Sequence, residues 1–343
     1  MVLGVGEKPA VRSGQGAIEV PVSIAPMMDR TDRHYRYFMR QITPGTLLYT
    51  EMVTSQAILH GDRERLLGFT PAEKPLVLQV GGDDPTSLAA CAHLAAAFSY
   101  DGINLNVGCP SDRVRSGNFG ACLMYQPQRV AAAVAAMVAA SPLPVSVKHR
   151  IGVDDRDRYE DMVDFVSTVA TAGCRHFTVH ARKAWLQGLS PKDNRTLPPL
   201  RYGDVYRLKQ EFPHLWIEIN GGITLLPQVQ EHLGRVDGAM IGRAAYDHPY
   251  LFAGVDGAFL GAPGWGRSRQ QVVEAMLPYL ETWLGQGLKL NKITRHMLML
   301  FAGQPGSRLW KQHLTEQSCR PGAGLEVVTQ ALAAVLEEYG PTL

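Results

Sequence analysis

The run of residues 104–111, Asn-Leu-Asn-Val-Gly-Cys-Pro-Ser, places two amides and one thiol where a predicted strand ends. Apolar residues alternate with Asn104 and Asn106, and the sequence Gly-Cys-Pro stops the strand abruptly. The polar strand end and the Cys109 thiol would then face the same opening, where chemistry can take place. Free cysteine is usually a small core residue, however, so this run alone favours a structural turn that holds an inert thiol.

Two glycine turns follow the last two predicted strands and are typical of a phosphate site. Asn220 precedes Gly221 and Gly222, and Gly242 precedes Arg243. Glycines leave backbone N–H groups free to bind an anion, and an arginine adds a charge-assisted contact. One Gly-Gly turn is a weak signal, but its pairing with a second turn one βα unit later is much more specific for the phosphate site of a barrel.

A phosphate bound at these turns would place an attached ring near Gln79 and Lys148. This arrangement suits FMN, because an amide can pair with the polar edge of the flavin ring and a cation near its N1–O2 edge stabilises the reduced form. Lys148 could instead form a Schiff base, as in barrel aldolases. The combination of Gln79 with the paired glycine turns favours the flavin.

Eight short apolar runs alternate with helical patterns and supply the elements that must position these residues. The runs cover residues 22–28, 47–52, 76–81, 103–107, 145–148, 177–180, 217–222 and 239–243. Amphipathic or alanine-rich stretches such as 84–98 and 157–172 lie between them, as parallel strands joined by crossover helices require. We therefore predict an α/β fold, a TIM (β/α)8 barrel, in preference to a doubly wound open sheet.

Polar residues at the carboxyl ends of these strands should meet at one rim, which is where barrels carry their active sites. They are Glu51, Gln79, Asn106, Lys148, His180, Asn220 and Arg243. Any one of them could be a satisfied core group. Their number and chemical variety favour a binding site.

After Gly261 the pattern changes to helices only, and Pro263 and Gly264 mark a linker. The expected helices cover residues 268–284, 289–301, 306–317 and 325–339. The expected domains are an N-terminal extension over 1–20, a catalytic FMN-binding barrel over 21–260 and a C-terminal all-α helical domain over 265–343.

The C-terminal helices carry a local excess of positive charge, although the net charge of the whole chain is only +2. Between residues 265 and 320, eight Lys or Arg stand against three acids. Such a count commonly reflects a solvated helical face. Trp310 between Arg308 and Lys311 nevertheless favours contact with a nucleic-acid backbone.

The composition excludes several classes of protein. A chain of 343 residues with 45% hydrophobic residues can bury a large core. Its five scattered cysteines form no Cys-x-x-Cys pair, so we expect neither a disulfide framework nor a metal site. Since no apolar stretch reaches signal-peptide or membrane-span length, we expect a reduced, cytoplasmic protein that does not enter the membrane. We separately expect a monomer.

Seven short segments match the pattern of one enzyme family. They are Ala25-Pro26-Met27, residues 78–82, residues 104–111, Lys148-His149-Arg150, residues 180–184, Asn220-Gly221-Gly222 and Gly242-Arg243. These segments resemble the flavin-dependent tRNA-dihydrouridine synthases, and the resemblance covers nearly the whole chain after residue 20. Residues 29–38, 49–54 and 183–191 resemble more narrowly the bacterial branch that modifies positions 20 and 20a of the tRNA D-loop.

The resemblance implies a reaction. NADPH, or NADH, would reduce FMN, and the flavin would pass a hydride to C6 of a uracil while Cys109 protonates C5, which gives 5,6-dihydrouridine. A thiol is mostly protonated at neutral pH and can therefore act as a general acid. The base must leave the RNA stack to reach the flavin, so a basic surface has to hold the rest of the tRNA.

The resemblance also implies site residues, position by position. The expected FMN contacts are Pro26, Met27, Met28, Gln79, Lys148, His180, Asn220, Gly221, Gly222, Gly242 and Arg243. Asn106 would face the uracil. The other expected RNA contacts are Arg182, Lys183, Lys192, Asn194, Arg195, Arg308 and Lys311. The resemblance thus implies that the helical domain over 265–343 binds tRNA.

Two other functions stay open from the sequence. Another FMN-dependent barrel oxidoreductase, similar to dihydroorotate dehydrogenase, would share the phosphate turns but would not need a basic helical domain. A barrel that only binds RNA would not need an intact Cys109, Lys148 and His180.

Overall fold

The computed structural model describes residues 13–14, 17–111, 114, 117–262 and 266–339. The chain divides into two compact units. Up to residue 28 and over 47–242, the described residues belong to what we call the barrel unit, and those over 29–46 and from 243 onward belong to the helical unit. Much of the expected extension over 1–20, together with Pro263 and Gly264, lies outside the described residues. The predicted domain boundaries therefore stay predictions.

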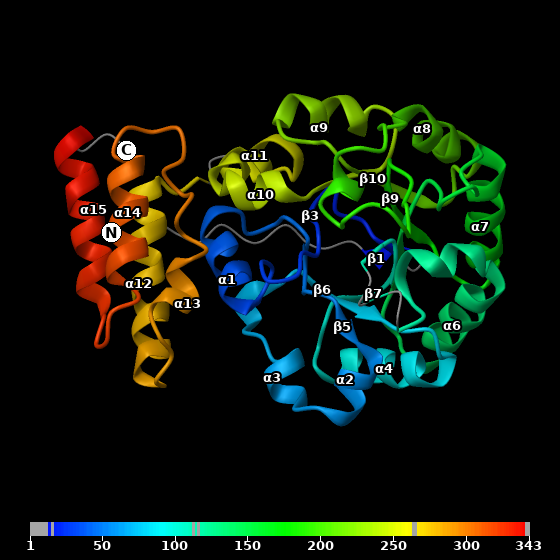
Figure 1. Ribbon diagram of the computed structural model, residues 1–343, viewed down its shortest axis with the longest axis horizontal. Coiled ribbons are helices and arrows are strands. Elements are labelled where there is room, and N and C mark those ends of the chain that lie inside the picture. The colour runs from blue at the N-terminus through cyan, green and yellow to red at the C-terminus, as the bar shows by residue number, and fades with distance from the viewer. Residues whose placement is uncertain (1–12, 15–16, 112–113, 115–116, 263–265, 340–343) are drawn as a thin grey trace. The chain divides into compact units, whose positions relative to one another are not determined.

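Parallel strands form the centre of the barrel unit (Figure 1). Neighbouring strands follow the order β3-β11-β10-β9-β8-β7-β6-β4, and a parallel bridge between Ser23 and Leu47 closes the ring. The strands are β3 (Val22–Ile24), β4 (Leu48–Tyr49), β6 (Leu76–Gly81), β7 (Gly102–Val107), β8 (Val145–Arg150), β9 (His176–His180), β10 (Trp216–Asn220) and β11 (Gly238–Ile241). The ring confirms the predicted barrel and excludes the open sheet.

Helices connect these strands and cover their outer faces (Figure 1). They are α2 (Ser55–His60), α3 (Arg63–Leu67), α4 (Pro85–Ala97), α6 (Pro127–Ala140), α7 (Tyr159–Thr171), α8 (Tyr202–Glu211) and α9 (Leu226–Leu233). Shorter elements are β1 (Ser13–Gly14), β2 (Ala17–Ile18), β5 (Val53–Thr54) and the 3-10 helices η1 (Pro71–Glu73), η2 (Gly120–Tyr125) and η3 (Asp193–Arg195). Every residue of β6 is buried, as expected for a parallel strand between a helical layer and the barrel interior.

The helical unit confirms the predicted all-α region and has its own apolar core. Its elements are α1 (Arg33–Ile42), α10 (Arg243–Asp247), η4 (Pro249–Gly254), α11 (Val255–Phe259), α12 (Arg269–Gly285), α13 (Asn291–Thr294), α14 (Ser307–Gln317) and α15 (Leu325–Tyr339). Ser268 and Gln271 form a capping box that starts α12. Val272, Met276 and Leu314 are among the buried residues of the core.

Two expectations for this unit are wrong. The helix expected over 289–301 ends at Thr294, because the chain beyond it bonds three residues back: Met297 N donates to Thr294 O at 2.9 Å and Leu300 N donates to Met297 O at 3.0 Å. Two side chains bind carbonyl groups of this segment, since the Trp310 indole donates to Met297 O at 2.9 Å and Arg269 donates to Leu300 O at 3.0 Å. Trp310 itself is fully buried. It is therefore a core residue and does not offer an aromatic surface to a nucleic acid.

Three features concern the class of protein. No helix in the described part of the chain is both long and apolar enough to cross a membrane. The described residues also contain no group of three or more His, Cys, Asp or Glu side chains arranged to hold a metal ion. All five cysteines are free.

Candidate active site

The Cys109 loop is held by the side chain at the end of β7. Asn106 Oδ1 accepts hydrogen bonds from the backbone N–H groups of Gly108 and Cys109, at 3.1 and 3.0 Å, and Ala121 N donates to Cys109 O at 2.9 Å. The Cys109 thiol is only half-buried and lies 3.4 Å from Ser111 Oγ. The Cys109 thiol is therefore not the buried thiol that this run alone favoured, and its role in the reaction stays a prediction.

Other cysteines of the barrel unit differ from Cys109. Cys91 and Cys174 are buried, and desolvation raises the pKa of each thiol to about 12. Cys122, which lies in η2, is half-buried and donates to Phe119 O at 3.1 Å. Desolvation raises its pKa as well.

A chain of side-chain amides runs through the barrel interior to Asn106. Asn106 Nδ2 donates to Gln79 Oε1 at 3.0 Å, and Gln79 Nε2 donates to Asn104 Oδ1 at 2.8 Å. Asn104 Nδ2 in turn donates to Ser146 Oγ at 2.9 Å. Two predicted site residues, Gln79 and Asn106, are therefore in direct contact.

Lys148 and Asn220 also meet inside the barrel. Lys148 Nζ donates to Asn220 Oδ1 at 3.1 Å, and Asn220 Nδ2 donates to Met240 O at 2.8 Å. In the parallel ladder Lys148 lies beside Asn106. Desolvation, with the Arg150 cation adding to it and Glu218 opposing it, lowers the pKa of Lys148 to about 8.

His180 ends β9 and packs against the first glycine turn. A Cβ on Gly221, whose φ is +115°, would lie 2.7 Å from His180 Cδ2, so this close approach requires glycine. Desolvation and the Arg150 and Lys148 cations lower the pKa of His180 well below its usual value. The imidazole is therefore neutral at physiological pH and can offer one ring nitrogen as a hydrogen-bond donor.

The glycine turns fit an anion. Gly222 also has a positive φ, +73°, and a Cβ there would lie 2.6 Å from Leu200 Cδ1. Within the described residues, the backbone N–H groups of Gly221, Gly222 and Gly242 donate to no protein acceptor. Three such donors suit phosphate oxygens. Arg243 follows directly as the first residue of α10.

The remaining predicted rim residues are placed as follows. Pro26 and Met27, which follow β3, are half-buried, whereas Met28 is exposed. Glu51 follows β4 and is half-buried.

Arg150 is the residue of this region that our sequence-based site did not include. It is 2% exposed, its Nε donates to Gly108 O at 2.9 Å, and its Nη1 donates to Lys183 O at 3.0 Å and Asn194 O at 2.9 Å. Desolvation lowers its pKa to about 10, so it is still a cation at neutral pH. It lies two residues beyond Lys148 on the same strand, so the two-residue period of a strand could have identified it.

The loop after β9 contains five of the predicted RNA contacts. Lys192 and Arg195 are exposed. Lys183 Nζ lies 3.0 Å from Asp157 Oδ2 and 4.0 Å from the centre of the Trp185 ring. Arg182 donates to Pro198 O.

The fifth, Asn194, is buried and orders the loop. Its Oδ1 accepts from Trp185 N at 2.8 Å and its Nδ2 donates to Trp185 O at 2.9 Å. Its side chain thus fixes the backbone of the loop. The last two predicted contacts, Arg308 and Lys311, are exposed on α14 of the helical unit.

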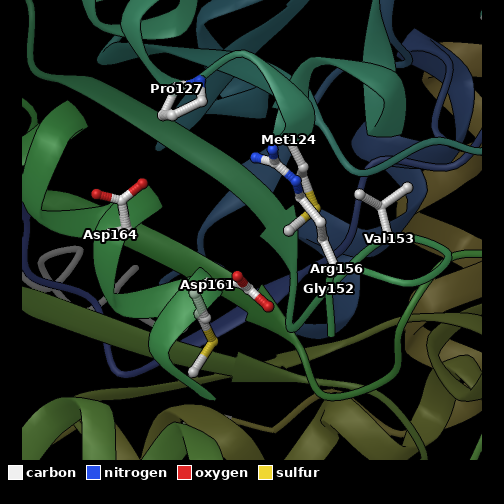
Figure 2. Close-up of a pocket in the computed structure, with 8 residues that line it drawn as sticks. Met124, Pro127, Gly152, Val153, Arg156, Asp161 and Asp164 are labelled. Atoms are coloured by element: carbon white, nitrogen blue, oxygen red, sulfur yellow. The ribbon is translucent and has the colours of Figure 1, made fainter. Parts of the chain in front are cut away.

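A small hollow lies beside the end of β8 and is lined by Met124, Gly152, Arg156 and Asp161, among others (Figure 2). None of its lining residues belongs to the predicted site. Its interior of about 20 Å³ has room for about one water molecule.

Comparison with known proteins identifies the family. The family described as dihydrouridine synthase (Dus) matches residues 23–336. A tRNA-dihydrouridine(20/20a) synthase of Synechocystis sp. is 62% identical over 92% of this chain and 94% of its own, and that of Vibrio vulnificus is 54% identical over 92% and 97%.

The protein of the same name from Escherichia coli K12 is 52% identical over 92% of both chains. Among solved structures, morphinone reductase in complex with tetrahydroNAD is 11% identical over 68% of this chain and 85% of that chain, with a TM-score of 0.48. The family match and the identity of these relatives lead to one conclusion. The chain belongs to the dihydrouridine synthase family.

Proposed function

We propose that this chain is a tRNA-dihydrouridine synthase that uses NADPH and FMN to reduce uridines 20 and 20a of the tRNA D-loop. Membership in the family makes it an oxidoreductase that acts on tRNA with a flavin and a nicotinamide reductant. The choice of positions is supported by relatives whose names specify 20 and 20a. We further propose that it acts in the cytoplasm as a monomer.

One observation supports the proposed chemistry most strongly. The half-buried Cys109 thiol, the Gln79–Asn106 amide pair, the Lys148–Asn220 pair and the glycine turns all belong to the barrel unit and lie at or near the carboxyl ends of its strands. A barrel that only binds RNA has no need for this set of donors.

The residues present fit FMN. The free N–H groups of Gly221, Gly222 and Gly242 suit its phosphate, and we propose that Arg243 adds a charge-assisted contact. Gln79, Lys148 and neutral His180 would bind the polar edge of the ring, and Asn220 holds the Lys148 ammonium in place. Pro26, Met27 and Met28 would contact the ring through apolar atoms. When bound, reduced FMN supplies a hydride for uracil C6.

The chain's own residues would complete the reaction. Asn106 binds the uracil, and the Cys109 Sγ–H donates its proton to C5. The basic loop with Arg182, Lys183, Lys192 and Arg195 would hold the RNA around the extruded base, and Asn194 orders that loop. Arg308 and Lys311 of the C-terminal helices would contact the RNA backbone.

The test is dihydrouridine mapping of tRNA from cells that lack this protein, combined with identification of the flavin in the purified protein. Loss of dihydrouridine at positions 20 and 20a, restored by the gene, supports the proposal. Unchanged dihydrouridine at both positions contradicts it. Release of FAD from the protein, or faster flavin reduction by NADH than by NADPH, would contradict the cofactor assignment alone.

A further inference from the structure

The amide chain in the barrel interior has a fixed direction. Each side chain donates to the one behind it, so the order of donation runs from Asn106 to Gln79, then to Asn104, then to Ser146. Gln79 and Asn104 are buried, at 1% and 0% exposure, and Ser146 is 6% exposed. Water therefore cannot readily replace the partners in these hydrogen bonds.

Backbone groups fix this direction at the substrate end. The N–H groups of Gly108 and Cys109 can only donate, so the carbonyl oxygen of Asn106 must face them. The NH2 group of Asn106 then lies against Gln79 Oε1. This in turn directs the NH2 group of Gln79 to Asn104 Oδ1 and that of Asn104 to Ser146 Oγ.

The far end supports the same direction. Ser146 Oγ lies 3.4 Å from the carbonyl oxygen of Ile103, to which it donates. Its lone pairs therefore face Asn104 and accept. The direction of donation is thus the same from Asn106 to Ser146, and we call this chain of hydrogen bonds the amide relay. A reversed Asn104 would set two carbonyl oxygens, its own and that of Ile103, to compete for the Ser146 proton.

One N–H of Asn106 is not used by this relay. Asn106 is half-buried, and in the described part of the chain its Nδ2 donates only to Gln79. The second N–H is a donor, which can pair with a carbonyl oxygen of uracil. If it faces position 4 of the base, it meets an oxygen in uracil but an amino group in cytosine. The orientation of this amide therefore affects the seating of the base.

We propose that Asn104 and Ser146 are positioning residues for uridine reduction, since they lock the Gln79 amide and through it present the free N–H of Asn106 to the base. This inference rests on the proposed function. Neither residue needs to touch the flavin or the uracil. Because Gln79 is also a proposed contact of the flavin, their effect should be larger in the step that uses tRNA than in the step that uses NADPH.

The experiment uses the full-length, FMN-loaded protein and compares Ser146→Ala with Ser23→Ala. Both serines are buried on barrel strands, but Ser23 Oγ donates to Glu218 at 2.5 Å and lies outside the relay. Ser146→Thr keeps the hydroxyl and tests rescue. Asn104→Leu removes the middle of the relay with little change in volume.

Four quantities are measured for each variant. They are the rate at which NADPH reduces the bound flavin, the rate at which unmodified tRNA reoxidises it, the FMN content and the melting temperature. Ser146→Ala removes the bond that Asn104 donates to Ser146 and should slow reoxidation by tRNA about 5-fold. Asn104→Leu removes both amide bonds of Asn104 and should slow it roughly 10- to 100-fold. Ser146→Thr and Ser23→Ala should stay within about twofold of wild type. In Ser146→Ala and Asn104→Leu, the NADPH step and the FMN content should change less than the tRNA step.

Several results would overturn the inference. If tRNA reoxidises the flavin at the wild-type rate in both Ser146→Ala and Asn104→Leu, then Asn104 and Ser146 have no positioning role. An equal slowing in Ser23→Ala, or an equal slowing of the NADPH step, indicates general damage to the barrel or the flavin site. If the unaltered protein forms no dihydrouridine, the proposed function fails and the inference fails with it, whereas wild-type rates in the two variants defeat the inference alone.

Discussion

The polar side chains at the strand ends of the barrel unit are largely buried and bonded to one another, whereas those on the exposed face of α14 are open to solvent. In the barrel, Asn106, Gln79 and Asn104 bind one another and the Cys109 loop in a largely buried chain. On α14, Arg308 and Lys311 are exposed to solvent. A reaction at single carbon atoms requires donors at fixed positions, whereas attraction of a polyanion requires mainly charge. Single-atom changes should therefore matter in the barrel, and only charge should matter on α14.

The largest effect should come from Cys109→Ala. We expect uridine reduction to fall about 10²- to 10⁴-fold, because protonation at C5 loses its general acid. Flavin content and reduction by NADPH should persist, since the sulfur is required only for the second half of the reaction. Stopped-flow absorbance with NADPH and then with tRNA separates the two steps.

Cys122→Ala is the matched control for this experiment, because Cys122 is also half-buried and its thiol bonds to Phe119 O. It should keep most of the activity. If Cys109→Ala reduced tRNA at the wild-type rate, Cys109 would have to be reassigned as a structural thiol. The contrast between the barrel strand ends and the exposed face of α14 would then lose its main support.

The next effect concerns the cation proposed for the phosphate of FMN. Arg243→Ala should raise the dissociation constant for FMN roughly 10- to 100-fold, as expected for the loss of one charge-assisted contact. Fluorescence titration of the protein freed of flavin measures it. If FMN binding is unchanged, the phosphate is held by the backbone N–H groups alone.

Lys148 should instead affect the reactivity of the flavin. Because its pKa is lowered to about 8, it carries a charge below that pH and loses it above. Reduction of bound FMN by NADPH should therefore slow as the pH rises through about 8, and Lys148→Arg should remove this decline because arginine stays charged. Reduction rates at saturating FMN across a pH series provide the measurement. The same decline in Lys148→Arg would assign it to another group.

The smallest effect should come from α14. Arg308→Ala combined with Lys311→Ala should weaken tRNA binding and reduce the salt slope of log K by roughly 0.7 to 0.9 per lost contact, without a change in NADPH oxidation. The uncharged Gln312→Ala on the same helix is the control. Binding measured over a salt series that shows no change in slope would leave the Arg182–Arg195 loop as the proposed RNA surface.

Much of the barrel could be predicted from the sequence, because parallel strands buried on both sides read as short apolar runs separated by helical patterns. Gln79, Asn106, Lys148 and Asn220 could be assigned to one site because polar residues near parallel strand ends converge. The structure brings these four into two hydrogen-bonded pairs. Their contacts with a ligand stay predictions.

The misses have a common physical origin. The segment after α13 and the burial of Trp310 share a hydrogen bond between groups that periodicity does not relate, because the Trp310 indole donates to Met297 O, 13 residues away in the sequence. Local sequence suggested a longer helix and an exposed aromatic. The RNA contact expected for Asn194 stays a prediction.

Arg150 has a consequence for the way this site can be changed. One guanidinium binds the carbonyl oxygens of Gly108, Lys183 and Asn194, which belong to two separate loops. Arg150 therefore couples the loop that carries Cys109 to the loop that carries Lys183 and Asn194. A basic loop transplanted from another barrel would have to offer two carbonyl oxygens to the same guanidinium. Without them, Arg150 would no longer hold the Cys109 loop in place.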